Sequence, residues 1–190
     1  MIKSIIDLDK KIFLFLNNLG VEFWDSFWIF ISNKLWMFLL ITPIILYSFL
    51  REKGSKSFYA ILMLIICFAV TDLIHVHLFK NVFLRLRPCW DPEIAPLSRV
   101  LVDKGGLYGF VSGHAANSAA IVGFLLFTTK RTYPLVKYFL IFWVLLVSYS
   151  RIYLGKHYLL DVLCGMLLGL LIAFFFFKLY NRFFVKKCET

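Results

Sequence analysis

The feature that most constrains this chain is a series of long apolar segments. Each approaches the roughly 20 residues that an α-helix needs to cross a bilayer, and they lie at 35–50, 58–78, 113–129, 135–152 and 158–179. Of the 190 residues, 61% are hydrophobic, and the mean hydropathy is +0.82. A soluble domain of this length is nearer half apolar and has too little interior to hide so much apolar surface. The sequence therefore predicts an all-α integral membrane protein.

The first 34 residues differ from these segments because polar residues interrupt them. In residues 1–20 the apolar side chains recur at helical spacing, which predicts an amphipathic helix lying in the membrane interface. Residues 21–34 mix acidic side chains with tryptophans, a composition typical of the headgroup level. We find no internal repeat or linker. We therefore predict one membrane domain, 1–190, with an interfacial segment at 1–34, about five transmembrane helices within 35–180 and an active-site loop at 87–112.

The chain is basic, with 21 Lys and Arg against 11 Asp and Glu. No basic stretch is long enough to form a nucleic-acid patch, so we predict no nucleic-acid partner. Stretches 51–56, 130–137 and 178–187 are basic and share one side if there are five spans, which the positive-inside rule makes cytoplasmic. The opposite side then receives loops 79–112 and 153–158. Those loops are also basic, so this topology is consistent with the positive-inside rule only if their charges have a function other than setting the orientation.

Two groups of polar residues on that opposite side suit phosphate binding. Lys80 and Arg87 are seven positions apart, and Pro88 follows. If the helix of 58–78 continues, both cations share a face and point into one pocket, and Pro88 marks the helix end. The second group is Ser112-Gly113-His114 at the start of segment 113–129, where glycine and free backbone N–H groups allow close approach of an anion.

A third group supplies a nucleophile. Arg151 is followed by His157, and Asp161 lies one helical turn beyond His157. The Asp161 carboxylate can hold the imidazole Nδ1–H, which leaves Nε2 free to attack. Together the three groups provide what cleavage of a phosphate ester without a metal requires. Cations neutralise the phosphate oxygens, one histidine attacks phosphorus, and His114 protonates the leaving oxygen.

These motifs resemble those of the type-2 phosphatidic acid phosphatase superfamily of membrane lipid phosphatases. The family pattern is Lys-x6-Arg-Pro, Pro-Ser-Gly-His and Ser-Arg-x5-His-x3-Asp. In this chain the order and spacing are kept over residues 80–161, as Lys80-NVFLRL-Arg87-Pro88, Val111-Ser112-Gly113-His114 and Ser150-Arg151-IYLGK-His157-YLL-Asp161. Val111 is the one departure, because the family usually has proline there.

The resemblance implies a role for each matched residue. His157 is expected to be the nucleophile that forms a phosphohistidine, Asp161 its orienting partner and His114 the general acid. The expected phosphate-binding residues are Lys80, Arg87, Ser112, Gly113 and Arg151. No metal ion or organic cofactor is implied.

Other polar residues near these motifs allow more than one interpretation. Asp72, His75 and His77 could form a metal site, but His75 and His77 diverge on a helix, so polar packing is favoured. His77 is expected to border the pocket. Arg85 is expected to be a solvated or headgroup-facing charge, and the acidic residues at 91 and 93 to shape the pocket entrance.

The predicted function is hydrolysis of a phosphate or pyrophosphate on a membrane lipid. The small chain without a large extra domain suggests a bacterial enzyme. Among its possible substrates, undecaprenyl pyrophosphate is slightly favoured over lipid A phosphate and phosphatidylglycerol phosphate. A non-catalytic lipid-binding or transport protein is the alternative from another class. The predicted location is the bacterial inner membrane, with the active site on the periplasmic side. The sequence leaves the oligomeric state open.

Overall fold

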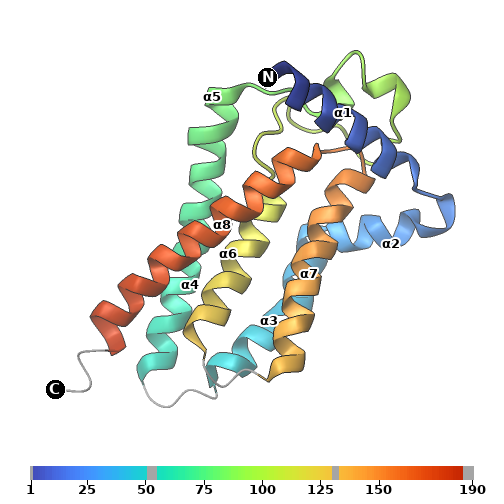
Figure 1. The fold of residues 1–190 in the computed structure, drawn as a ribbon. Helices are drawn as coiled ribbons and strands as arrows, with labels where there is room; N and C mark the ends of the chain where they lie inside the picture. Colours follow the sequence, from blue (N-terminus) through green and yellow to red (C-terminus); the bar gives the residue numbers. More distant parts are fainter. Residues whose placement is uncertain (1, 51–54, 130–132, 186–190) are drawn as a thin grey trace.

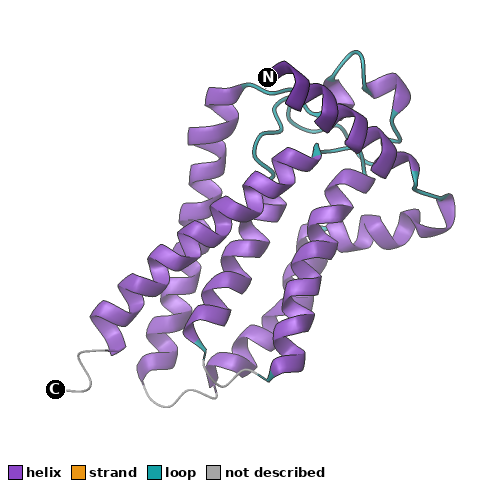
Figure 2. Ribbon diagram, viewed as in Figure 1, coloured by secondary structure: helices purple, strands orange, loops and turns teal. Residues whose placement is uncertain are grey.

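The computed structural model describes residues 2–50, 55–129 and 133–185, and these residues form helices joined by loops, with no β-strand among them (Figure 2). The helices are α1 (Ile2–Asn18), α2 (Glu22–Ser32), α3 (Lys34–Leu50), α4 (Ser55–Ile74), η1 (His75–Lys80), α5 (Asn81–Phe83), η2 (Pro88–Trp90), η3 (Ala95–Leu97), α6 (Gly113–Thr128), α7 (Pro134–Tyr153), α8 (Leu159–Tyr180) and η4 (Asn181–Val185). The all-α prediction is confirmed, and each of the five apolar segments is helical.

Helix α6 lies at the centre of the bundle, with α4 and α8 on one side and α7 on the other (Figure 1). Its residues 115–125 are all buried. Small residues let α8 approach it closely, because a Cβ added at Gly169 would lie 2.1 Å from the carbonyl oxygen of Ala116. Such backbone-to-backbone contact between small residues is the usual way in which helices associate in lipid.

The outer surface of the bundle is apolar enough for a membrane. Three helices, at 56–83, 134–153 and 159–185, have the length and composition of a membrane span. Helices α2 and α3 form a pair bent by 64°, which makes a fourth if the pair is one span, and α6 is shorter, with 16 residues. The membrane-helix class is thereby confirmed, while the count of about five crossings stays a prediction.

Helix α1 lies across one end of the bundle, beside the long loop that follows α5 (Figure 1). The side-chain amide of buried Asn17 donates hydrogen bonds to the carbonyl oxygens of Arg99, Ile152 and Tyr153 at 2.9–3.0 Å. Phe13 is also buried on this side of α1. The predicted N-terminal helix is thus confirmed as a helix, and its placement in a membrane interface remains a prediction.

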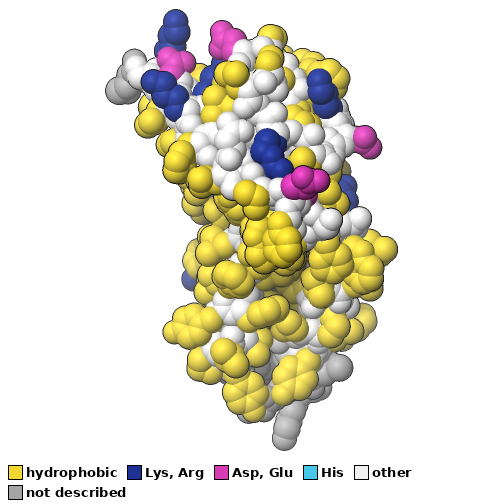
Figure 3. All heavy atoms as spheres, turned by 90° about the vertical axis from the view of Figure 1, so that its right-hand side faces the viewer, with side chains coloured by type: hydrophobic (Ala, Val, Ile, Leu, Met, Phe, Trp, Pro, Cys, Tyr) yellow, Lys and Arg dark blue, Asp and Glu magenta, His cyan; other side chains and the backbone are white. Residues whose placement is uncertain are grey.

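On the face of the molecule shown in Figure 3, charged side chains are unevenly distributed. In Figure 3 most of the visible charged side chains lie on the upper part of the molecule, and hydrophobic side chains cover the lower part. The C-terminal ends of α3, α6 and α8 lie at the opposite end of the bundle from the long loop (Figure 1). The basic stretches that predicted a cytoplasmic side fall partly outside the described residues, at 51–54, 130–132 and 186–187.

The expectation that Lys80 and Arg87 share one helix face is wrong. Helix α4 passes into a π-helical turn at His75–Lys80, and the helix ends at Phe83. Leu84 then adopts a left-handed backbone with φ of +49°, which turns the chain into the loop. Pro88 begins a separate 3-10 turn and does not end the helix. The helix therefore ends between Lys80 and Arg87, so helical spacing cannot relate the two positions.

Candidate active site

The three motifs meet in a polar cavity of about 270 Å³ at the end of the bundle that α1 covers. It is lined by Lys34, Asp72, His75, Lys80, Arg87, Gly113, His114, Asn117, Arg151, Lys156 and His157. Six of the predicted site residues are among them. The other two, Ser112 and Asp161, are fully buried beside the cavity. The tertiary structure therefore gathers all three motifs even though the helical argument for the first one fails.

His157 lies in the turn between α7 and α8 and is buried. Its Nδ1 is 3.5 Å from Oδ2 of Asp161, within ion-pair range but without a hydrogen bond. The same Oδ2 accepts the backbone N–H of Tyr158 at 3.0 Å, which caps α8. Burial and the nearby cations lower the pKa of His157 well below its ordinary value. The imidazole is therefore neutral at physiological pH, as a nucleophile must be.

His114 sits in the first turn of α6, and its Nε2 is 3.1 Å from the carbonyl oxygen of Ser32. A carbonyl oxygen can only accept, so this contact assigns the proton to Nε2. In this conformation Ser32 holds the Nε2–H, so a general-acid role requires His114 to exchange this partner for the leaving oxygen of the substrate. Ser32 lies at the bend between α2 and α3, so the segment predicted to be interfacial contributes to the wall of the site.

Arg151 and Arg87 supply guanidinium groups to the cavity. Arg151 is 8% exposed, its Nη1 donates to the Ser32 hydroxyl, and its Nε has no partner within the described part of the chain. Arg87 is anchored by two loop carbonyl oxygens, Tyr108 at 3.1 Å and Lys104 at 3.2 Å. A guanidinium has five N–H donors, so both keep donors available for an anion.

Lys156, the residue directly before His157, also lines the cavity and was not among the predicted site residues. Its side chain donates to the carbonyl oxygens of Asp103 and Lys104. Burial, with repulsion from Arg87, lowers the pKa of Lys156 to about 8. The available signal was a basic residue beside a motif histidine. The motif fixes only the spacing between Arg151 and His157, and it does not specify the residue at position 156.

His75, and not the predicted His77, borders the cavity. The π turn beginning at His75 changes which side of the helix faces inward. A Cβ added at Gly113 would lie 2.4 Å from Nε2 of His75. Glycine is thus needed here for the imidazole as well as for the approach of an anion. The N–H of Ser112 is occupied, since it donates to the carbonyl oxygen of Asp161 at 2.9 Å.

Asp72 and His75, two of the three residues considered as a possible metal site, make hydrogen-bonding contacts within the protein. Oδ1 of Asp72 accepts a hydrogen bond from the amide of Asn117 at 2.8 Å. His75 Nδ1 is 3.2 Å from the carbonyl oxygen of Thr71. Over residues 2–50, 55–129 and 133–185, no group of three or more His, Cys, Asp or Glu side chains is placed to hold a metal ion.

The expectation for Arg85 as a solvated charge is wrong. Its Nη1 donates to Oδ1 of Asp161 at 2.8 Å, and its Nη2 donates to Oδ2 of Asp9 at 2.6 Å. Asp91, expected at the entrance, accepts hydrogen bonds from the Tyr158 hydroxyl at 2.9 Å and pairs with Lys10 at 3.0 Å. These contacts link α1, the long loop and the start of α8 behind the site.

Comparison with known proteins leads to the same family as the resemblance of the three motifs. The family model of the PAP2 superfamily matches residues 56–184. Similar proteins include a lipid A 4'-phosphatase of Porphyromonas gingivalis, 28% identical over 93% of this chain and 74% of the relative. Another is a lipid A 4'-phosphatase of Bacteroides thetaiotaomicron, 33% identical over 89% of this chain and 75% of the relative.

The fold also matches a solved structure. The PAP2-type phosphatidylglycerolphosphate phosphatase of Bacillus subtilis superposes with a TM-score of 0.73, covering 95% of this chain and 88% of that one at 23% identity. The match extends beyond residues 56–184 and so includes the N-terminal helices in the shared fold. With its motif residues assembled in one cavity and the family model spanning them, this chain belongs to the PAP2 superfamily and is a membrane-embedded lipid phosphatase.

Proposed function

We propose that this enzyme hydrolyses a lipid phosphate in two steps through a phosphohistidine at His157, without a metal ion. In the first step, Nε2 of His157 forms a bond to phosphorus as the bond to the leaving oxygen breaks, and His114, acting as an imidazolium, gives a proton to that oxygen and becomes neutral. In the second, water attacks phosphorus, the P–N bond breaks, and His114 takes the proton from the water. The products are the dephosphorylated lipid and inorganic phosphate.

The observation that carries this proposal is the composition of the cavity. Two motif histidines share it with the cationic side chains of Lys34, Lys80, Arg87, Arg151 and Lys156. Positive groups fixed around a phosphoryl group stabilise the charge on its oxygens in the transition state, which is the main demand of phosphoryl transfer. The same cations attract the phosphate of the substrate from the membrane surface.

For the substrate, the relatives favour lipid A 4'-phosphate or a similar sugar phosphate on a lipid anchor. The two relatives described above cover about nine-tenths of this chain, and both are named lipid A 4'-phosphatases. This support gives a phosphomonoester on a glycolipid precedence over undecaprenyl pyrophosphate, which the sequence alone had favoured. Phosphatidylglycerol phosphate is the second candidate, through the likeness to a phosphatidylglycerophosphatase B of Bacillus subtilis, 31% identical over 63% of this chain.

The test is phosphate release by the purified protein in detergent, with excess EDTA, from the three lipid phosphates at equal surface concentration. We expect turnover in EDTA, inhibition by vanadate, which mimics pentacoordinate phosphorus, and the highest kcat/KM on lipid A. Loss of all activity in EDTA with recovery in Mg²⁺ would contradict the mechanism. A clear preference for undecaprenyl pyrophosphate would contradict the substrate assignment but leave the mechanism intact.

We further propose that the site opens on the outer face of the bacterial inner membrane. The stretches 51–56, 130–137 and 178–187 hold no motif residue, so their positive charge reports orientation and places them inside. Leu97 lies in the long loop and is 60% exposed. In a cysteine-free variant, Leu97→Cys should react with an impermeant thiol reagent on intact cells, and Lys56→Cys should react only after lysis. The reverse pattern would place the site in the cytoplasm.

A further inference from the structure

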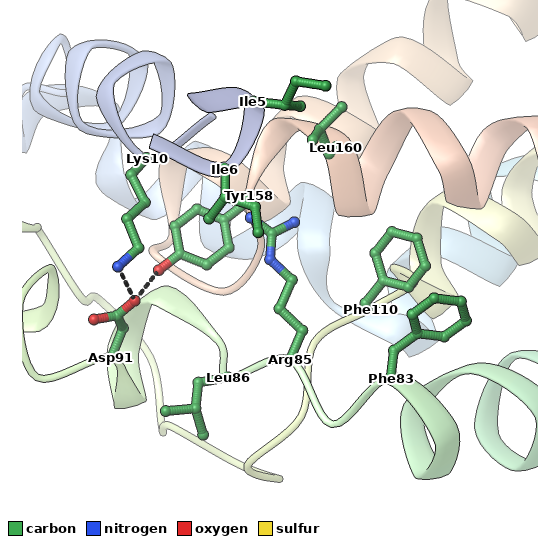
Figure 4. A pocket seen from close by; sticks show the side chains of 10 residues that line it. All are labelled: Ile5, Ile6, Lys10, Phe83, Arg85, Leu86, Asp91, Phe110, Tyr158 and Leu160. Carbon is green, nitrogen blue, oxygen red and sulfur yellow. Dashed lines mark hydrogen bonds and ion pairs between the residues drawn. The ribbon is translucent and has the colours of Figure 1, made fainter. Parts of the chain in front are cut away.

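Arg85 occupies a place in the structure that the family motif does not assign. It lies in the loop after α5, on the wall of a second cavity of about 590 Å³ between α1 and the loop. Figure 4 shows its side chain extending from the loop toward the ring of Tyr158, beneath α1, with Phe83 and Phe110 to one side. The guanidinium carbon is 4.3 Å from the centre of that ring. This is the geometry of a cation–π contact.

The guanidinium joins two buried carboxylates. The side chains of Asp161 and Asp9 are 0% and 2% exposed, and each receives one N–H of Arg85. Each acid also accepts one backbone N–H from the start of α8, Asp9 from Leu160 and Asp161 from Tyr158, both at 3.0 Å. A buried carboxylate without a cation is strongly unfavourable. One cation therefore serves two anions, one of them the partner of His157.

We propose that Arg85 is a positioning residue of the active site, which keeps Asp161 ionised with Oδ2 toward Nδ1 of His157, and that Asp9 of α1 competes with Asp161 for its charge. The proposal rests on the proposed role of His157 as nucleophile. It also adds Asp9, which lies outside the residues 56–184 that the family model matches, to the groups that orient the nucleophile. The Arg85 guanidinium is held by the two carboxylates and acts on phosphate only through Asp161.

Several charged or titratable groups face Asp161 besides Arg85. They are Asp9 from α1, Arg87 from the loop, His157 from the turn before α8, and Tyr158 and Cys164 from its own helix end. Arg87 favours the ionised carboxylate, and Asp9 disfavours it. Removing Arg85 therefore leaves Asp161 with only the more distant cation, whereas removing the charge of Asp9 leaves Asp161 the sole anion on Arg85.

These two changes have opposite consequences for the pH profile. In Arg85→Met, Asp161 takes up a proton more readily, so the acid limb of kcat/KM moves to higher pH. In Asp9→Asn, Asp161 holds its charge to lower pH, so the acid limb moves to lower pH. If Asp9, Arg85 and Asp161 had a purely structural role, the acid limb would have no reason to move in opposite directions in the two variants. The pair of variants therefore separates a positioning role from loss of folding.

The experiment measures kcat, KM and the pH dependence of phosphate release from a short-chain lipid phosphate in detergent, for wild type, Arg85→Met, Arg85→Lys and Asp9→Asn. We expect kcat of Arg85→Met to fall about 100-fold or more, with KM changed less than about threefold, since disturbing the carboxylate of a His–carboxylate pair affects the chemical step. Arg85→Lys should restore part of the loss, because an ammonium can serve one carboxylate but not both in fork geometry.

Lys10→Met is the matched control. Lys10 joins the same helix to the loop through Asp91 and Glu93, at 3.0 and 2.9 Å, and does not contact Asp161. It should keep the wild-type kcat and pH profile. If Arg85→Met does not fold, as judged by gel filtration and thermal unfolding, Asp9→Asn and Arg85→Lys decide the question by their pH profiles.

The outcomes distinguish this inference from the function on which it rests. Unchanged kcat and acid limb in the Arg85 variants, or shifts in the same direction for Arg85→Lys and Asp9→Asn, overturn the positioning role. His157→Ala is measured in parallel. If that variant keeps its activity, the proposed nucleophile itself is wrong, whatever the Arg85 variants show.

Discussion

The body of the bundle and its polar end are held together in different ways. In the body, α6 and α8 meet through small residues, and large apolar side chains such as Phe175, 58% exposed, point outward. At the polar end, charged side chains such as the half-buried Arg85 and the buried Asp161 pair with one another. Lipid offers the helices no hydrophobic driving force for association, so the body depends on close packing, whereas the end depends on ion pairs and hydrogen bonds between charged groups. Substitutions should therefore act through volume in the body and through charge and protons at the end.

The largest expected effect tests the polar end at its nucleophile. His157→Ala should lower kcat by about 10⁴-fold or more and leave no phosphoenzyme, because it removes the proposed nucleophile. The measurement is phosphate release together with trapping of acid-labile phosphoenzyme. His77→Ala is the matched control, since His77 is an exposed histidine outside the cavity, and it should keep the wild-type rate.

A smaller effect at the polar end depends on the substrate. His114→Ala should lower kcat by about 10²- to 10⁴-fold on an alkyl phosphate, the range that a general acid contributes. A phenolate leaving group needs little protonation, so much of the rate should return on an aryl phosphate. Comparing the two substrates measures this difference. Equal losses on both would show that His114 does not protonate the leaving oxygen.

In the body, the corresponding test is one of volume. Gly169→Leu should destabilise the fold by about 1–3 kcal/mol or more, because its Cβ would lie 2.1 Å from the Ala116 carbonyl oxygen and 2.9 Å from the Ala120 nitrogen, both backbone atoms. Thermal unfolding in detergent measures the change. Leu171→Ala, at a position 60% exposed toward lipid, serves as the control and should shift Tm little. Similar changes in Tm for both variants would contradict the proposed difference between the α6–α8 contact and the exposed surface.

The smallest expected effect concerns Lys156, whose pKa is lowered to about 8. The ammonium is charged below that pH and loses its charge above it, so attraction for phosphate is present at neutral pH and declines as pH rises past 8. Lys156→Met should therefore raise KM about tenfold at pH 7, the value of one charge-assisted hydrogen bond, and much less at pH 9. Steady-state kinetics at the two pH values measures this. A KM ratio independent of pH would exclude the ammonium as the cause.

Hydropathy and motif spacing were enough to predict the helices of this protein and most of the residues that line its cavity. The five apolar segments are helices because a window of about 20 apolar residues is itself a physical requirement of the bilayer. His157 and Asp161 could be paired from the sequence because they are only four positions apart, where the turn into α8 and its first residues keep them close. Lys80 and Arg87 were assigned to the right cavity although the helix between them ends at Phe83.

Only the tertiary structure decided the partners that are distant in sequence. Arg85 was interpreted as a solvated or headgroup-facing charge, whereas its two carboxylates come from 76 residues before and 76 residues after it. The π turn that brings His75 to Gly113 leaves no mark in the spacing of side chains. Spacing determines which residues share a face of one helix, but contacts between helices and loops depend on how the chain packs, so the sequence alone located the chemistry and the fold supplied the groups that hold it in place.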